Sequence, residues 1–577
     1  MIDKIQALWP EIALFITTCI VMVIGLSPSR EIRKLCSPIC ALGLIVAGYL
    51  AYQTTPLGAG PLPHLALYGK LLVAGIGLLL LMLMAGVADR EYEKAVAFEE
   101  KRRGVASGIF DAIRATRGEF YSFFLFSLTG LMLCAGADDL IWLFLALELT
   151  SLPTYVMVAI STSRNRSMEA GVKYFFLGAL GAAMFLYGFA LIYGGTGTTN
   201  MAQIQAELSR QVLTPGGGSI NTIALLGFIL AIVGILFKIA AVPMHFYTPD
   251  VYEGAASPVA AFLAFVPKSA GFFAIMLLTA CVGWRFPATF GAHASAAADH
   301  GSLPEALRIT LWIVAALTMT VGNVLAILQT SVKRVLAYSS IAHSGYMLVG
   351  IIAGPGTDGR FASSGLAAVL FYLLCYGVMN IGGFAVLSCL ERKGRDGKME
   401  EADSFADIRG LCHTRPLLGW IMVLSSMGLL GLPPLLGFMG KVPLFSSGLS
   451  AGEYVLVVVL GLNSAIAAYY YLRLAYAALI EKPESQPALA PITESPFPSR
   501  AYAGVLSAAG VVLIAILGGN LADQAGFAAH IRQTQPVIID GSVHAASATS
   551  GQPEPLALAD QQSPSLQQPA SKEPAHP

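Results

Sequence analysis

Long apolar runs separated by short polar segments dominate the sequence. Many of these runs reach about twenty residues, which is the length that a helix needs to cross a bilayer. The run at 416–447 is too long for one straight helix, and Pro433 and Pro434 in its interior predict a break. Pro243 predicts a similar break in the seventh run. We therefore expect an all-α polytopic membrane protein with fourteen spans, at about 11–26, 36–53, 71–88, 119–137, 139–160, 170–193, 222–246, 258–282, 307–330, 333–353, 364–389, 416–447, 453–480 and 500–520.

The order of the predicted spans indicates an internal symmetry. The two broken helices lie five spans apart, and an odd number of spans reverses the direction of the chain. Spans 4–8 and 9–13 therefore predict two inverted five-helix repeats, a layout found in ion-coupled transporters. The resulting division is an N-terminal part at 1–118 with a cytoplasmic insert at about 89–118, a first repeat at 119–282, a second repeat at 307–480, a last span at 500–520, and a tail at 521–577 whose polar composition predicts disorder.

Composition and charge support a membrane location and narrow the class of partner. The 577 residues are 55% hydrophobic and only 12% charged, with a mean hydropathy of +0.68. The net charge is zero, so no nucleic-acid partner is expected. The eight cysteines lack the spacing of a zinc site or an iron–sulfur cluster. Lys and Arg gather in alternate loops, including 89–118 and 390–415, which predicts that these loops are cytoplasmic and that both termini are periplasmic.

A few ionisable residues lie inside the predicted spans, where a charge is costly and usually has a task. Lys238 lies five residues before Pro243, and Glu148 lies five residues before Pro153. We interpret Glu148 as the single carboxylate that lies deep in a span. Lys268 lies one span after Lys238. The candidate site residues are Glu148, Lys173, Lys238, His245, Lys268, His343 and Lys441.

This set of residues suits proton transfer. Burial disfavours the charged form of a lysine, whereas a nearby carboxylate stabilises it. A lysine that Glu148 approaches, either Lys238 or Lys173, would keep its proton and release it when the pair separates. Structural alternatives stay open for three residues: Lys173 can extend to the membrane surface, His245 can satisfy backbone groups freed at the break, and His343 can be a packed, hydrogen-bonded residue.

Four segments carry a resemblance to a known family. They are LALELTSLPTYV (145–156), FKIAAVPMHFYTPDVYEGAASPVAAFLAFVPKSAGFF (237–273), KRVLAYSSIAHSGYML (333–348) and GLPPLLGFMGKVPLF (431–445). The chain resembles the antiporter-like membrane subunits of bacterial NADH–quinone oxidoreductase, respiratory complex I, a family that also includes subunits of multi-subunit cation/proton antiporters. Within this family the PDVYEGA form resembles the N-type subunits, and Lys441 argues against the M-type, in which a glutamate is expected in the equivalent broken helix.

The resemblance implies a fold, a role and a set of partners. It implies fourteen helices with two inverted repeats, with Glu148 and Lys238 as a coupling pair, Lys268 as the central group and Lys441 as the exit-side group. It implies a proton-translocating part of NADH:quinone oxidoreductase in the bacterial inner membrane, in contact with lipid and neighbouring membrane subunits. No cofactor is expected in this chain, while flavin, iron–sulfur clusters and quinone are expected in partner subunits. A cation/proton antiporter subunit and a structural membrane scaffold remain as alternatives.

Overall fold

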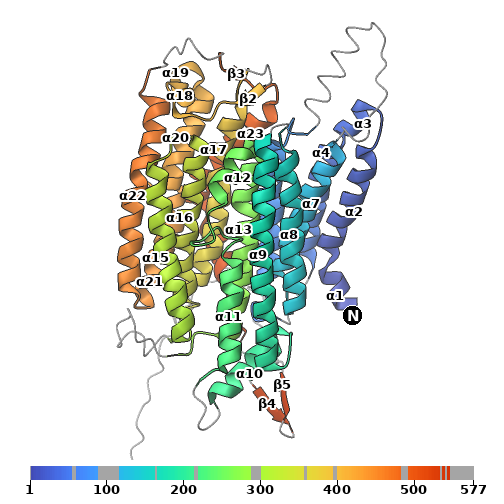
Figure 1. Ribbon diagram of the computed structural model, residues 1–577, viewed down its shortest axis with the longest axis vertical. Helices are drawn as coiled ribbons and strands as arrows, with labels where there is room; N and C mark the ends of the chain where they lie inside the picture. Colours follow the sequence, from blue (N-terminus) through green and yellow to red (C-terminus); the bar gives the residue numbers. More distant parts are fainter. Residues whose placement is uncertain are drawn as a thin grey trace, which may run out of the picture.

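The computed structural model describes residues 2–54, 60–88, 116–162, 165–213, 219–286, 301–356, 360–393, 399–482, 491–532, 536–539 and 542–545. Over these residues the chain forms a bundle of long helices that run roughly side by side (Figure 1). Within the described ranges, eleven helices are long and apolar enough to cross a membrane, and three further apolar helices are shorter. The prediction of an all-α polytopic membrane protein is confirmed, whereas the number of spans and the inverted repeats stay predictions.

The elements follow one another in this order. The first half contains α1 (Ile2–Ala7), α2 (Trp9–Gly25), α3 (Arg30–Lys34), α4 (Cys36–Gln53), α5 (Leu65–Leu83), α7 (Arg117–Ala135), α8 (Leu140–Ile160), α9 (Asn165–Thr196), α10 (Met201–Leu213), α11 (Thr222–Ile235), α12 (Thr248–Gly254) and α13 (Ser257–Val282). The second half contains α15 (Glu305–Ile327), α16 (Val332–Ala353), α17 (Gly365–Cys389), β1 (Leu390–Lys393), β2 (Met399–Glu401), α18 (Phe405–Ile408), α19 (Leu411–Thr414), α20 (Pro416–Leu430), α21 (Leu436–Ser450), α22 (Tyr454–Leu479), β3 (Thr493–Glu494), α23 (Pro498–Leu517), α24 (Gly519–Ala528), β4 (Pro536–Ile539) and β5 (Ser542–Ala545).

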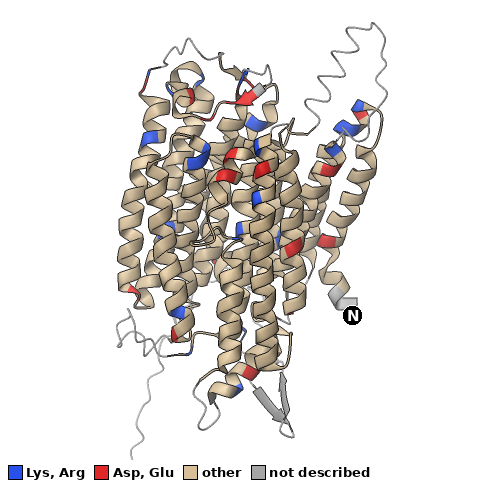
Figure 2. Ribbon diagram, viewed as in Figure 1, with Lys and Arg blue, Asp and Glu red and all other residues tan. Residues whose placement is uncertain are grey.

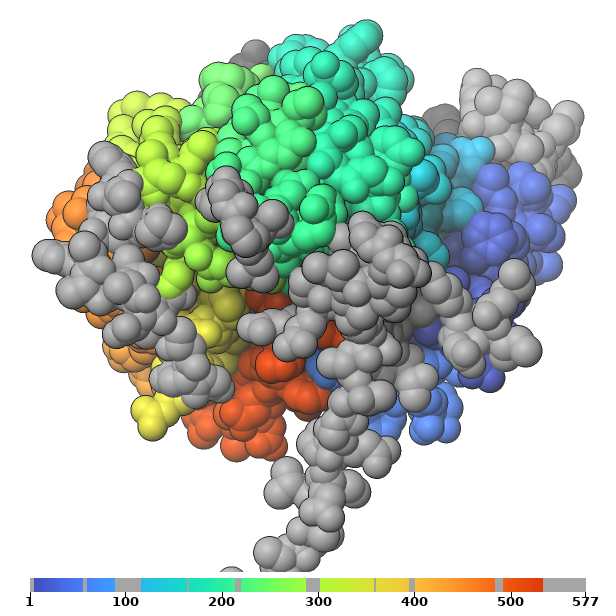
Figure 3. All heavy atoms as spheres, turned by 90° about the horizontal axis from the view of Figure 1, so that it is seen from below, coloured from blue at the N-terminus to red at the C-terminus, as the bar shows by residue number. Residues whose placement is uncertain are grey.

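Helices α13, α16 and α17 form the centre of the bundle. Every residue of α13 and nearly every residue of the other two is buried, as expected for helices that are apolar on all sides. Seen along the bundle, the N-terminal helices and α22 lie on opposite sides of this centre (Figure 3). Most charged positions lie toward the two ends of the helices, and few lie between (Figure 2). Apart from the partly exposed Arg334 of α16, the polar groups on these three helices therefore face other protein groups.

Both predicted helix breaks are present. Helix α11 ends at Ile235 and α12 begins at Thr248, so the first break starts well before Pro243. Ala240 in this segment has a φ of 56°, in the left-handed region. The second break separates α20 from α21 at Pro433 and Pro434, as the sequence predicts. Each break leaves backbone groups without helical partners inside the bundle.

One end of the bundle carries a small antiparallel sheet in the order β2–β1–β3. The predicted disorder of the tail is wrong for residues 521–528, which belong to α24. Ala525 and Ala528 are buried there, where α24 packs against α17 and α5, and an apolar contact of this kind outweighs the polar composition that follows. The insert at 89–118 lies almost entirely outside the described residues, as do residues 546–577.

Candidate functional site

Lys238 lies at the start of the first break and faces α8. Its ammonium group donates to Glu148 Oε1 at 3.1 Å, to Ser151 Oγ at 2.5 Å and to the Leu147 carbonyl oxygen at 3.2 Å. The side chain of Lys238 is 1% exposed and that of Glu148 is 19% exposed. The structure thus brings together the two residues that the sequence singled out most clearly, and each compensates the other's charge within the protein.

Side chains from three places satisfy the backbone groups that the first break frees. Tyr247 donates to the Phe237 carbonyl at 2.7 Å, and Ser344 of α16 donates to the Ile239 carbonyl at 2.5 Å. Thr318 of α15 accepts from a backbone N–H of the break at 3.0 Å. These bonds keep an irregular segment stable within the bundle.

His245 lies in the same break with a buried ring. Its Nδ1 atom has no hydrogen-bond partner among the described residues, and its ring packs on Phe246 with centroids 4.6 Å apart. The backbone groups named above are satisfied by other side chains. The structure does not join His245 to Lys238 or to the other candidate residues by a hydrogen bond.

Lys268 lies in α13 and contacts α16. Its ammonium group donates to the Ser340 carbonyl oxygen and, at 2.7 Å, to Ser340 Oγ. It also lies 5.0 Å from the centroid of the Tyr376 ring, a distance at which a cation is attracted to the aromatic face. Gly271, one turn further along α13, packs directly against Lys238: a Cβ there would lie 3.1 Å from that of Lys238. The two lysines are therefore neighbours across one helix contact.

His343 lies one turn after Ser340 on α16 and bridges two tyrosines. Its Nδ1 atom lies 2.7 Å from the Tyr372 hydroxyl of α17, and its Nε2 atom lies 2.8 Å from the Tyr471 hydroxyl of α22. The Tyr376 ring, which also contacts Lys268, has its centroid 5.1 Å from that of His343. Both ring nitrogens are thus hydrogen-bonded, so the ring is oriented for accepting a proton on one side and donating one on the other.

Lys441 follows the second break, at the start of α21. Its ammonium group donates to the Leu430 carbonyl at 2.7 Å and to the Leu429 carbonyl at 3.3 Å, the last residues of α20. The negative end of the helix dipole stabilises a cation at this position. Tyr346 of α16 lies on the other side, with its ring centroid 5.1 Å from the ammonium nitrogen.

These contacts place the ionisable groups in one buried row. Helix α16 runs along this row and contributes one residue at each step. Ser340 contacts Lys268, His343 contacts the two tyrosines, and Tyr346 contacts Lys441. Such a row can pass protons from Lys268 to Lys441, because each group there is within hydrogen-bonding or ring contact of the next. Lys238 adjoins this part of the row through the packing of Gly271 against its side chain. Among the described residues, no three His, Cys, Asp or Glu side chains are grouped as a metal site.

Lys173 lies outside this row. Its side chain is 45% exposed on α9 and forms ion pairs with Glu169 at 2.8 Å and Asp250 at 3.3 Å. The possible pairing of Glu148 with Lys173 is not observed, because Lys173 lies on an outer face of its helix while Glu148 contacts Lys238.

A family model matches the part of the chain that holds the row. The model describes the transmembrane region of NADH:quinone oxidoreductase and Mrp antiporter proteins, and it matches residues 137–467. This range includes every candidate site residue. The chain belongs to this family.

Two other comparisons agree with this family. NADH-quinone oxidoreductase subunit N of Trichlorobacter lovleyi is 39% identical, over 82% of this chain and 86% of that protein. Subunit N of Salinibacter ruber is 38% identical, over 72% of this chain and 77% of that protein. A chain of respiratory complex I from Thermus thermophilus with bound aureothin superposes with a TM-score of 0.66 at 30% identity, over 90% of this chain and 99% of that chain. A chain of the Mrp complex from Dietzia has a TM-score of 0.67 at 17% identity, over 92% and 97%, and shares the fold.

The structure also buries charges that the sequence analysis missed. Glu11 of α2 and Lys70 of α5 form an ion pair at 2.9 Å, and each side chain is 5% exposed. Glu148 is thus not the only carboxylate buried among the membrane helices that the structure describes, while its depth within a span stays a prediction. Glu11 lies at the predicted edge of a span and Lys70 one residue before another, so only the packing of α2 near α5 reveals the pair.

Neutral members of the row also escaped sequence analysis. Ser340, Tyr372 and Tyr471 bind Lys268 and His343, yet serine and tyrosine are common in membrane helices. The available signal was the spacing of Ser340 and His343, which places both on one face of a helix.

Proposed function

We propose that this chain is a proton-translocating membrane subunit of a bacterial NADH–quinone oxidoreductase. It moves protons across the inner membrane while partner subunits transfer electrons from NADH to quinone. The observation that carries this proposal is the buried row from Glu148 through Lys238, Lys268 and His343 to Lys441. Each cation inside the membrane costs an insertion energy of about 2.5–3.5 kcal/mol. A protein that served only as a scaffold would gain nothing from several such cations in one row.

The contacts suggest how a proton moves along the row. While Glu148 lies beside Lys238, its charge stabilises the ammonium form. When the carboxylate moves away, Lys238 loses that stabilisation and releases its proton toward Lys268, its neighbour across Gly271. His343 accepts at one nitrogen and donates at the other, between two tyrosine hydroxyls. Lys441, at the second break, receives the proton last.

The finer architecture belongs to the same proposal. Fourteen spans, two inverted repeats at 119–282 and 307–480, and periplasmic termini are consistent with the described helices. The three shorter apolar helices, Trp9–Gly25, Thr222–Ile235 and Pro416–Leu430, match predicted spans 1, 7 and 12. In Figure 1, α11 begins at the lower end of the bundle and α20 at the upper end, which supports opposite orientations of the two broken helices. The end that carries β1–β3 is then cytoplasmic.

The partners follow from the relatives. Proteins named subunit N work within NADH-quinone oxidoreductase, and the similar solved chains come from multi-subunit membrane complexes. We infer that neighbouring antiporter-like and small membrane subunits contact this chain, together with lipid. Flavin, iron–sulfur clusters and quinone are then held by other subunits.

Replacing Lys238 tests this function. In inverted membrane vesicles, Lys238→Met is expected to lower NADH-driven proton uptake and quinone reduction by about tenfold or more. Electron transfer from NADH to ferricyanide, which bypasses the membrane subunits, is expected to persist and so reports assembly. Lys173→Met is the matched control, since this lysine lies outside the row.

Two results would point elsewhere. Normal pumping by an assembled Lys238→Met complex would contradict the proposed function and favour a scaffold. Exchange of Na⁺ for protons without NADH, if Lys238→Met abolished it, would favour a cation/proton antiporter.

A further inference from the structure

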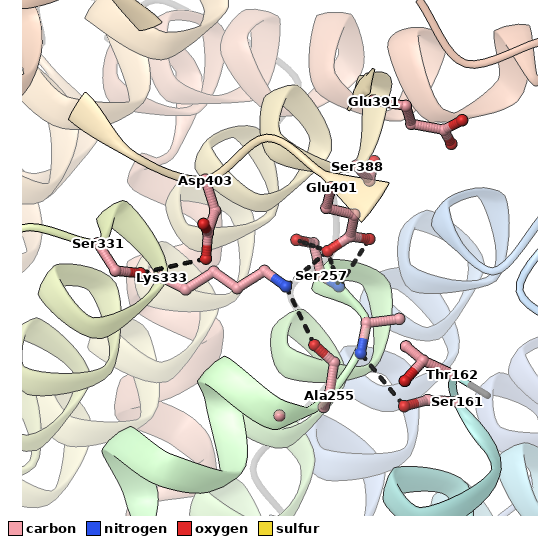
Figure 4. A network of polar contacts seen from close by, with 12 residues as sticks. Ser161, Thr162, Ala255, Ser257, Ser331, Lys333, Ser388, Glu391, Glu401 and Asp403 are labelled. Carbon is pink, nitrogen blue, oxygen red and sulfur yellow. Dashed lines mark hydrogen bonds and ion pairs between the residues drawn. The ribbon is translucent and has the colours of Figure 1, made fainter. Parts of the chain in front are cut away.

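A second buried charge cluster lies at the end of the bundle that carries the β1–β3 sheet, away from the row of lysines. It is formed by two ion pairs from Glu391, Glu401, Lys333 and Arg500. The Asp403 carboxyl lies in the same network (Figure 4), interacts electrostatically with Lys333 and Glu401, and accepts from Ser331 Oγ at 3.2 Å. Lys333 Nζ lies 2.6 Å from Glu401 Oε2, and Arg500 Nη1 lies 3.4 Å from Glu391 Oε1. The four side chains range from 3% to 18% exposed. The pairs carry no net charge, so they compensate one another within the protein.

The β-hairpin explains why the cluster needs two cations. Glu391 of β1 and Glu401 of β2 are directly opposite in the antiparallel register. Side chains at opposite positions lie on the same face of the ladder, and two like charges there repel. Arg500 also donates to the carbonyls of Ser388 and Ala85, so it fixes Glu391 against α17 and α5. Lys333 compensates the charge of the second carboxylate, Glu401.

Glu401 binds two of the three central helices at once. Its carboxylate accepts from the backbone N–H of Ser257 at 3.0 Å and from Ser257 Oγ at 2.6 Å, at the first turn of α13 (Figure 4). The residue before Ser257 is an alanine that provides no side-chain cap. The Oε2 atom of Glu401 that accepts from Ser257 Oγ also binds Lys333, which lies in the first turn of α16 and donates to the Ala255 carbonyl at 3.1 Å. Glu401 thus supplies the missing N-terminal cap of α13 and ties it to α16.

The two helices joined by Glu401 are those that hold the central lysine of the row. Lys268 lies eleven residues after Ser257 on α13, or about 16 Å along the helix. Ser340 lies seven residues after Lys333 on α16, or about 10 Å. Both helices are buried and continuous over these lengths. A shift of α13 relative to α16 at the Glu401 contacts therefore moves Lys268 relative to Ser340. A helix displacement of about 1 Å is enough to weaken a hydrogen bond.

We propose that Glu401 is a positioning residue for proton transfer, which fixes α13 against α16 and so sets the contact of Lys268 with Ser340. This inference rests on the proposed function of the row. Glu401 remains anionic at neutral pH: burial acts to raise its pKa, but Lys333 and Ser257 hold the pKa below its usual range. Glu401 therefore keeps its charge and holds the two helices together, and it does not itself carry protons.

Variants of the whole complex test the proposal. In Glu401→Gln, coupled quinone reduction and proton uptake are expected to fall at least about fivefold, with NADH–ferricyanide activity retained and the pH optimum of quinone reduction displaced. Glu401→Asp keeps the charge and is expected to recover part of the rate. Glu400→Gln is the control, because neighbouring strand residues point to opposite faces.

A double variant separates positioning from charge balance. Lys333→Met alone leaves an excess negative charge and is expected to reduce assembly, while Lys333→Met with Glu401→Gln restores neutrality and assembly. If that double variant assembles but pumps poorly, positioning is supported. If it pumps normally, Glu401 serves charge balance alone and the proposal is overturned.

Failure of this inference is distinguishable from failure of the proposed function. Lys268→Met in the same vesicles tests the row itself. Normal pumping by Lys268→Met contradicts the proposed function. Loss of pumping in Lys268→Met together with normal pumping and an unchanged pH profile in Glu401→Gln overturns only the role of Glu401.

Discussion

Neutralising Glu148 is a sharp test of the row, because its effect can be worked out from one distance. Two unit charges 3.1 Å apart attract by about 5 kcal/mol at an effective dielectric constant of about 20. Glu148→Gln removes this attraction but keeps an oxygen acceptor for Lys238. The bonds of Lys238 to Ser151 and to the Leu147 carbonyl remain, so we expect the subunit to fold and assemble.

The kinetic consequence follows from the size of that attraction. A change of about 1.4 kcal/mol in a barrier alters a rate tenfold, so transmission of about a quarter of the lost energy slows proton transfer about tenfold. The assay is NADH-driven proton uptake into inverted vesicles, divided by NADH–ferricyanide activity to correct for assembly. An assembled Glu148→Gln complex with an unchanged ratio would refute the reasoning.

Glu11→Gln is a matched control for the same electrostatic change. Glu11 and Lys70 are 2.9 Å apart, so their attraction is similar, about 6 kcal/mol at that dielectric constant. The Glu11 side chain is more deeply buried than that of Glu148. The pair lies outside the row. We expect Glu11→Gln to lower the thermal stability of the complex while leaving protons translocated per NADH unchanged. Equal loss of coupling in both variants would mean that any buried charge, rather than this row, controls pumping.

Two further predictions concern packing and pH. In Gly271→Ala the new Cβ would lie 2.5 Å from Ile239 Cγ2, so we expect a loss of about 1–3 kcal/mol in stability and weaker pumping as Lys238 is displaced. Gly75→Ala, where nothing lies within 4 Å, should leave both unchanged, and equal effects would contradict this account. Burial raises the pKa of the Asp403 carboxyl, so its contribution to stability is present below its unfolded pKa of about 3.9 and is lost as pH rises through the folded value. Asp403→Asn is therefore expected to raise the unfolding temperature more at pH 7 than at pH 4. Thermal unfolding followed by intrinsic fluorescence measures this difference. An equal shift of the unfolding temperature at both pH values would contradict the prediction.

The sequence predicted the helices and the strongest members of the row because their signals are local. The length of an apolar run predicts a membrane span, and a proline within a span predicts a break in the helix. A single charged residue within a span predicts a functional role. Lys238, Lys268 and Lys441 are recognisable on these grounds alone. The family motifs then indicated which residues belong together.

What the sequence did not predict depends on which faces of the helices meet. Lys173 has the same apolar surroundings as Lys268, yet one lies on an outer face and the other in the core. Hydrophobicity cannot separate these cases, because lipid and protein interior are both apolar. The capping of α13 by Glu401 joins residues more than a hundred positions apart, so no local pattern could have shown it.

Lys238, Lys268 and Lys441 differ in how many of their N–H donors are used in hydrogen bonds. An ammonium group has three N–H donors, and the neutral amine has two. The described residues offer Lys238 three acceptors, whereas they offer Lys268 and Lys441 two each. Lys268 and Lys441 can therefore become neutral with every bond intact. A neutral Lys238 keeps its three partners only if the Ser151 hydroxyl turns to donate to the amine and gives up its bond to the Leu147 carbonyl. Loss of a proton from Lys238 is thus tied to a rearrangement of the groups around it, which makes this lysine the point where a conformational change would start or stop the transfer of charge.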